Sequence, residues 1–143
     1  MSKLVIGCGY LGRRVAQEWS RAGDAVWALT RSRDRAAELA AQGLVSVIGD
    51  VTRPESLRAL PPADTVLYAV GLDRQSGHTQ REVYVDGLVN VLRRLETVPS
   101  RFVYISSTSV YGEDAGEWVD EETQCRPRSS NGQVCLDAEL ELR

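Results

Sequence analysis

A glycine-rich loop between an apolar run and a helical repeat is the feature that most constrains this chain. The apolar run covers residues 3–7, the loop reads GCGYLG over 7–12, and apolar side chains recur at helical spacing through 11–23. In a strand–GxGxxG–helix unit the glycines allow a tight turn, a phosphate against the backbone, and close packing of helix on strand. The free N–H groups at the helix start receive the anion. The candidate nucleotide-binding residues are Gly7, Gly9, Tyr10, Leu11 and Gly12.

The rest of the chain continues this alternation of strand and helix. Short runs that are apolar throughout are typical of strands buried on both faces, so we predict a parallel sheet with helices on both sides. The final segment, LDAELELR, alternates as a strand would, but its helix-forming residues and the βα rhythm favour a helix. This is a Rossmann-like doubly wound α/β fold in one domain, residues 1–143. The expected strands are 3–7, 25–30, 44–49, 65–71 and 101–106, and the expected helices are 11–23, 34–43, 54–60, 79–96 and 131–142.

Composition excludes several classes of function. Of the 143 residues 43% are hydrophobic and 26% charged, and the net charge is −3, which indicates no general affinity for nucleic acid or an acidic membrane surface. The early apolar run is too short for a signal peptide or a membrane span, so we expect a cytoplasmic protein. Cys8, Cys125 and Cys135 show no metal-ligand spacing, and we predict no metal site. His78 is expected in a loop.

The end of the second expected strand carries basic and hydroxyl side chains. An acidic residue there would bond the ribose 2′-hydroxyl of NAD, but this chain reads Thr30-Arg31-Ser32. Arg31 can hold a 2′-phosphate by two parallel hydrogen bonds, and the hydroxyls can add more. The alternative is a solvated basic patch that includes Arg33 and Arg35, although like charge at a helix N-terminus is unfavourable without an anion. We expect NADP, with NAD as the alternative.

Two further strand ends belong to the same edge of the predicted sheet. Asp50 and Val51 follow the third strand, where a carboxylate can accept from the adenine amino group and the valine can lie against the ring. Ala69, Val70 and Gly71 end the fourth strand with small residues that leave room for a ribose or nicotinamide. Either stretch could be an ordinary turn. Because ligands bind at the carboxyl ends of such sheets, a shared site is the better interpretation.

The stretch YISSTSVYG, residues 104–112, places hydroxyl side chains after the fifth expected strand. With GCGYLG, GDV and YAVG before it, the chain resembles the NAD(P)-dependent epimerase/dehydratase branch of the short-chain dehydrogenase/reductase superfamily. The resemblance implies that Ser107 is the catalytic serine, bonded to a substrate hydroxyl or carbonyl. It also implies that Ser106 and Tyr111 lie near the nicotinamide and substrate.

The chain departs from this family at its Tyr-x-x-x-Lys pair, in which lysine lowers the pKa of a tyrosine acid/base. With Glu139 as the anchor, the two positions hold Asn131 and Cys135. Tyr111 is the candidate substitute acid, and the alternative is that it packs over the cofactor. Cys135 lacks a neighbouring base in sequence, which argues against a nucleophile.

The resemblance leaves two functions open. The first is an oxidoreductase or epimerase-like enzyme acting on a nucleotide-sugar or a similar hydroxyl or carbonyl substrate. The second is a non-catalytic NAD(P)-binding or sensor domain. Family chains are about twice as long, so we expect a truncated chain without the substrate lobe. We also expect the fifth strand to form a sheet edge, where a homodimer could pair.

Overall fold

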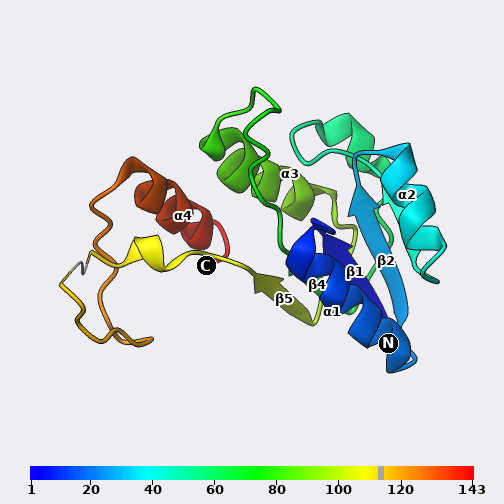
Figure 1. Cartoon of the computed structure of the whole chain (residues 1–143), viewed down its shortest axis with the longest axis horizontal. Helices are drawn as coiled ribbons and strands as arrows, with labels where there is room; N and C mark the ends of the chain where they lie inside the picture. Colours follow the sequence, from blue (N-terminus) through cyan, green and yellow to red (C-terminus); the bar gives the residue numbers. More distant parts are fainter. Residues whose placement is uncertain (113–114) are drawn as a thin grey trace.

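The computed structural model describes residues 1–112 and 115–143 and contains one five-stranded sheet (Figure 1). The strand order is β3-β2-β1-β4-β5, and every neighbouring pair is parallel. This order confirms the predicted doubly wound fold, because the chain runs outward through β3 and then crosses over to β4. The strands are β1 (Ser2–Ile6), β2 (Ala25–Thr30), β3 (Val45–Ile48), β4 (Thr65–Tyr68) and β5 (Arg101–Tyr104).

Helical elements follow each strand, as predicted, but two differ in type. The expected helix 54–60 is a 3₁₀-helix, and the expected helix 79–96 contains a π-turn and ends at Arg94. The final segment is helical, so packing overrides its strand-like alternation. The expected strand 65–71 stops at Tyr68, because the chain then turns beside the glycine loop. The elements are α1 (Tyr10–Arg21), α2 (Arg33–Ala40), η1 (Pro54–Ala59), η2 (Glu82–Asp86), α3 (Gly87–Arg94), η3 (Thr108–Val110) and α4 (Ser130–Leu140).

Alternate side chains of the central strands enter two separate cores. Leu4 and Ile6 of β1 face a core that also takes side chains from η1, η2, α3 and α4. Val5 faces the opposite core, with α1 and α2 over it. All three are fully buried, which explains why the strand is apolar throughout. No helix of the described residues is long and apolar enough to cross a membrane.

Strand β5 lies at one edge of the sheet, as expected, but only one of its faces is covered (Figure 1). Phe102 and Tyr104 pack against the core beneath α3, whereas Val103 is 36% and the following Ile105 43% exposed. The expectation of burial on both faces is therefore wrong for this strand, because no helix in the described part of the chain lies over Val103. A homodimer through this edge stays a prediction.

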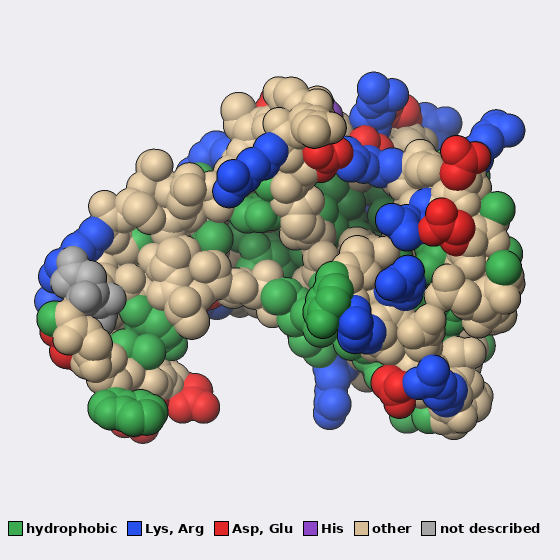
Figure 2. All heavy atoms as spheres, viewed as in Figure 1, with side chains coloured by type: hydrophobic (Ala, Val, Ile, Leu, Met, Phe, Trp, Pro, Cys, Tyr) green, Lys and Arg blue, Asp and Glu red, His purple; other side chains and the backbone are tan. Residues whose placement is uncertain are grey.

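After β5 the chain leaves the sheet as an arm, made of η3 and residues 115–128, and returns into α4. Gly132 of α4 lies against η3 so closely that an added Cβ would stand 2.2 Å from the Ser109 carbonyl oxygen. This contact ties the start of α4 to the base of the arm. Figure 2 shows the surface hollowed between the arm and the part built from α1 and the sheet.

Candidate functional site

Two cavities open at the carboxyl ends of the strands, the edge that the sequence predicted. Cavity one, about 380 Å³, lies beyond β1, β2, β3 and β4. Cavity two, about 250 Å³, lies beyond β4 and β5. They share the wall formed by residues 69–71. The predicted residues in cavity one are Gly7, Gly9, Thr30, Arg31, Asp50, Val51, Ala69, Val70 and Gly71, and those in cavity two are Leu11, Ala69, Val70, Gly71, Ser106 and Ser107.

The glycine loop makes a tight turn and leaves open space in front of its backbone. Gly7 has a φ of +94°, and an added Cβ would lie 2.5 Å from the Ala69 backbone. A Cβ on Gly12 would lie 2.1 Å from the Gly7 carbonyl oxygen, so this glycine packs α1 onto the loop. By contrast, a Cβ on Gly9 would meet nothing within 4 Å. Gly9 therefore leaves open space in front of the backbone where a phosphate can approach.

The start of α1 is free to accept an anion. No side chain of the described residues caps it at Gly9, and its first turn contains no acidic residue. The leading N–H groups of the helix therefore remain available, together with the positive end of its dipole. Cys8, inside the loop, is buried, and burial raises the pKa of its thiol to about 11 despite Arg35 and Arg13 nearby. The loop thus adds no negative charge at neutral pH.

Arg31 at the end of β2 lines cavity one, but it is already paired. Its Nη2 atom lies 3.2 Å from Oδ2 of Asp73, in the loop after β4. Thr30 also lines the cavity and accepts a hydrogen bond from the Ser32 amide at 3.4 Å. Ser32 lines neither cavity, because it caps α2 and accepts from the Arg35 amide at 3.1 Å. The sequence analysis missed Asp73, which no motif marks.

Asp50 and Val51 are placed where the sequence predicted them, in the wall of cavity one. The Oδ1 atom of Asp50 accepts from the amide and the hydroxyl of Thr52, at 2.9 and 2.8 Å. The Thr52 hydroxyl also lies 3.4 Å from Nε2 of His78, a loop residue as expected. These contacts hold the carboxylate while leaving acceptor capacity on its second oxygen. Val51 is buried beside it.

Ser106 and Ser107 meet in cavity two. The Ser107 hydroxyl caps η3, accepting from the amide and hydroxyl of Ser109 at 3.2 and 2.9 Å. A hydroxyl that accepts both of these bonds still has its own hydrogen to donate. Ser106 donates to Glu139 of α4 at 2.5 Å. Ser107 is thus the serine with an uncommitted donor at this cavity.

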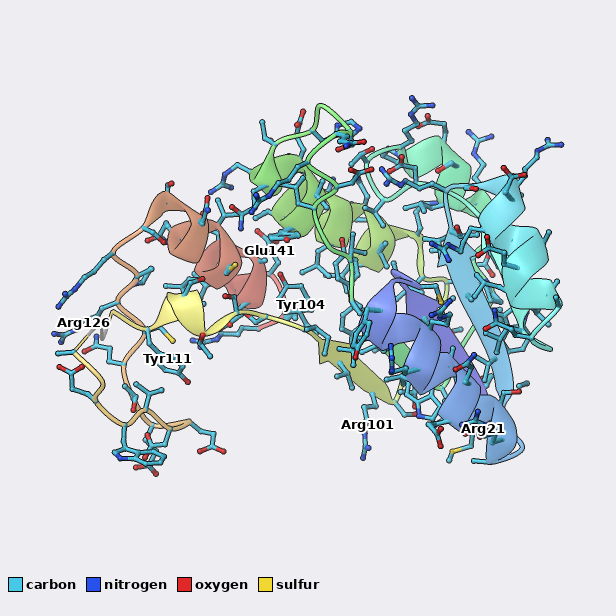
Figure 3. All side chains as sticks on the ribbon, viewed as in Figure 1. Arg21, Arg101, Tyr104, Tyr111, Arg126 and Glu141 are labelled. Carbon is cyan, nitrogen blue, oxygen red and sulfur yellow. The ribbon has the colours of Figure 1, made fainter. Side chains whose placement is uncertain are left out.

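Two predicted tyrosines lie outside both cavities. The Tyr111 hydroxyl donates to the Asp120 carbonyl at 3.1 Å, and partial desolvation raises its pKa above the usual value. In Figure 3 Tyr111 lies out on the arm, whereas Tyr104 lies between β5 and α4. Tyr10 is 77% exposed, with the Arg14 guanidinium 3.6 Å from its ring centre. Neither tyrosine shares a cavity with Ser107.

The segment aligned with the family's catalytic pair does reach cavity two. Cys135 is buried, lines that cavity, and lies 3.8 Å from Nε2 of Gln80. Asn131 is exposed in the first turn of α4 and lines neither cavity. The helix therefore brings a thiol, rather than an ammonium group, to the cavity that Ser107 also lines.

Cavity two contains two further hydroxyl groups that the sequence analysis missed. Tyr84 lies in the π-turn η2 and accepts a hydrogen bond from the Leu72 amide at 3.2 Å. Tyr104 stacks on Tyr68 with ring centres 5.7 Å apart, and burial raises its pKa to about 12. Helical periodicity could not find Tyr84, because a π-turn shifts side chains around the helix axis and often marks functional positions.

Comparison with known families matches the chain to one of them. The model of the NAD dependent epimerase/dehydratase family matches residues 4–132. The chain belongs to this family. The chain is also similar to a solved Methylobacillus flagellatus protein whose description proposes an NAD-dependent epimerase/dehydratase. That structure is 32% identical, with a TM-score of 0.78 over 99% of this chain and 50% of that one.

Two other proteins are similar to this chain, one in sequence and one in fold. The photosystem II assembly factor Ycf39 of Synechocystis is 33% identical over 109 residues, which are 74% of this chain and 33% of that protein. The Bordetella bronchiseptica enzyme WbmG, solved with NAD and UDP, shares the fold at 20% identity, with a TM-score of 0.81 over 99% of this chain and 49% of WbmG. This epimerase/dehydratase-family chain thus spans about half the length of the solved structures it matches.

Proposed function

We propose that the chain binds an NAD(P) dinucleotide across its two cavities and prefers NADP. The observation that carries the proposal is the meeting of both cavities at residues 69–71, beside an uncapped helix start that follows the glycine loop. The adenosine half would lie in cavity one, with Asp50 facing the adenine and Arg31 the 2′-phosphate. The nicotinamide half would lie in cavity two. A pyrophosphate would join them at Gly9.

For the intact protein we propose oxidoreductase or epimerase-like activity on a nucleotide-sugar or a similar hydroxyl or carbonyl compound. The nicotinamide, when bound, exchanges a hydride with a substrate carbon. Ser107 would donate a hydrogen bond to the substrate oxygen, since its hydroxyl hydrogen is uncommitted. The similar enzyme WbmG, solved with NAD and UDP, supports this substrate class. Tyr111 as the acid would require the arm to bring it toward Ser107.

The second candidate function is non-catalytic binding, in which the dinucleotide is a structural or sensed ligand. It is favoured by Cys135 in cavity two, because a buried thiol cannot replace the positive charge that a lysine brings there. Asn131, at the tyrosine position, cannot transfer a proton as an acid or base. Cytoplasmic location is proposed with both functions.

Thermal unfolding with NADP⁺ and NAD⁺ tests binding first. At about 100 times its dissociation constant, a ligand should add roughly 2.7 kcal/mol to the free energy of unfolding. No shift with either dinucleotide would refute both functions. Incubating the intact protein with NADP⁺ and UDP-glucose, and following both absorbance at 340 nm and the sugar products by chromatography, then separates them. A net oxidation or a new sugar product that disappears in Ser107→Ala supports the enzyme, whereas binding by the intact protein with neither change supports the non-catalytic domain.

A further inference from the structure

The mouth of cavity one contains an ion pair between the ends of two strands that are not neighbours in the sheet. Arg31 follows β2 and Asp73 belongs to the loop after β4, and their nearest atoms are 3.2 Å apart. Both side chains line cavity one and are about half exposed, at 50% and 48%. Basic and acidic side chains also intermix on the α2 side of the molecule (Figure 2). An incoming ligand therefore meets Arg31 together with its counter-charge.

Asp73 is the fixed member of this pair. Its Oδ1 atom accepts from the Gln75 amide at 3.0 Å, and its carbonyl accepts from the amide and hydroxyl of Ser76, at 3.0 and 2.6 Å. The Gln75 amide and Arg31 hold the pKa of Asp73 below its usual value, so the group is ionised at neutral pH. Arg31, by contrast, has a long, flexible side chain that is held among the described residues by its ion pair with Asp73.

The Arg31–Asp73 ion pair should affect the binding of NAD and of NADP differently. A ribose with a free 2′-hydroxyl can enter while Arg31 stays paired, because a neutral group does not compete for the guanidinium. A 2′-phosphate has to share or displace the Asp73 carboxylate, and it brings like charge close to that carboxylate. Arg35, which also lines the cavity, is itself 2.8 Å from Glu38. It therefore offers no unpaired positive charge to offset Asp73.

We propose that Asp73 is a specificity-determining residue, whose carboxylate competes with a 2′-phosphate for Arg31 and so weakens the binding of NADP selectively. The inference rests on the proposed function, since it assumes that cavity one takes the adenosine half of a dinucleotide. It adds a second residue to the specificity of the site, from a loop that sequence motifs do not mark. Arg31 favours the phosphate, and Asp73 limits that preference.

Calorimetric titration of the wild-type chain, Asp73→Asn and Glu96→Gln with NADP⁺ and NAD⁺ tests this role. Asparagine retains an oxygen for the Gln75 amide but removes the charge, and Asp73→Ser, which also retains a turn acceptor, serves if asparagine disturbs folding. Glu96 is exposed in the bend that follows α3 and controls for net charge. We expect Asp73→Asn to lower the NADP⁺ dissociation constant about threefold to tenfold, and that of NAD⁺ less than about twofold. Glu96→Gln should change neither.

The outcomes separate the inference from the proposed function. If both dinucleotides bind the wild-type chain and Asp73→Asn leaves their ratio unchanged, the specificity role is wrong while dinucleotide binding stands. An equal gain for Glu96→Gln would also overturn the role, because it would show a general charge effect. If neither dinucleotide binds the folded wild-type chain, the proposed function and this inference both fail.

Discussion

Replacing Gly12 by alanine tests whether the glycine loop is shaped by close packing. The new methyl would stand 2.1 Å from the Gly7 carbonyl oxygen and 3.1 Å from Cγ1 of Val5. To bring the first distance to 3.0 Å, α1 and the loop would have to separate by about 0.9 Å. The obstacle is backbone, so no rotamer change relieves it.

The magnitude follows from two opposing effects. Alanine in place of glycine inside a helix ordinarily stabilises by about 1 kcal/mol. Overpacking against an immobile neighbour costs about 3 kcal/mol, the upper end of the usual range. We therefore expect Gly12→Ala to lower the free energy of unfolding by about 2 kcal/mol. Urea unfolding followed by circular dichroism measures this difference.

Gly9→Ala is the matched control within the same loop. Gly9 has a φ of −78°, and a Cβ there would meet nothing within 4 Å, so the variant should lose at most about 1 kcal/mol as a helix cap. Its methyl would instead occupy the space proposed for the pyrophosphate, and NADP⁺ affinity should fall about tenfold or more. A Gly12→Ala protein as stable as wild type would refute the packing argument. Unchanged NADP⁺ binding by Gly9→Ala would refute the placement of the phosphate.

Three other substitutions have outcomes that the structure predicts. Burial raises the folded-state pKa of Cys8 from 9.0 to about 11, so this thiol should lower the wild-type free energy of unfolding by about 2 kcal/mol between pH 9 and 11. Burial also raises the pKa values of Tyr68 and Tyr104, so Cys8→Ala should still lose stability, but about 2 kcal/mol less than wild type, when both are unfolded in urea at pH 8 and 11. Tyr68→Phe leaves the Val83 carbonyl without its 3.0 Å donor and should cost about 1–2 kcal/mol, measured in the same way at pH 7. Tyr84→Phe removes the acceptor of the Leu72 amide, so hydrogen exchange at that amide should accelerate while the β1 amides remain protected; unchanged exchange would mean that this bond does not hold the loop.

Local patterns were sufficient to predict most of the fold, because the residue types in a short run indicate whether a strand is buried. The apolar run at residues 4–6 has alternate side chains in two cores, and an unbroken apolar run of this kind is typical of a strand buried on both faces. Gly12 could be assigned for the same reason, since its close contact with the Gly7 carbonyl is made within one short loop. The contact of Gly7 with the Ala69 backbone joins distant segments, and only the tertiary structure shows it. The edge position of β5 also agreed, but the exposure of Val103 did not, because coverage depends on where distant helices lie.

The sequence by itself determined the doubly wound sheet, the glycine loop and the strand ends that meet in two cavities. These features depend on residue type and period, which act over a few residues. Only the tertiary structure decided that Asp73 faces Arg31 across 42 positions of sequence, that a π-turn brings Tyr84 into cavity two, and that Tyr111 lies on the arm. Such contacts join segments distant in sequence, and their geometry exists only after the strands are ordered side by side.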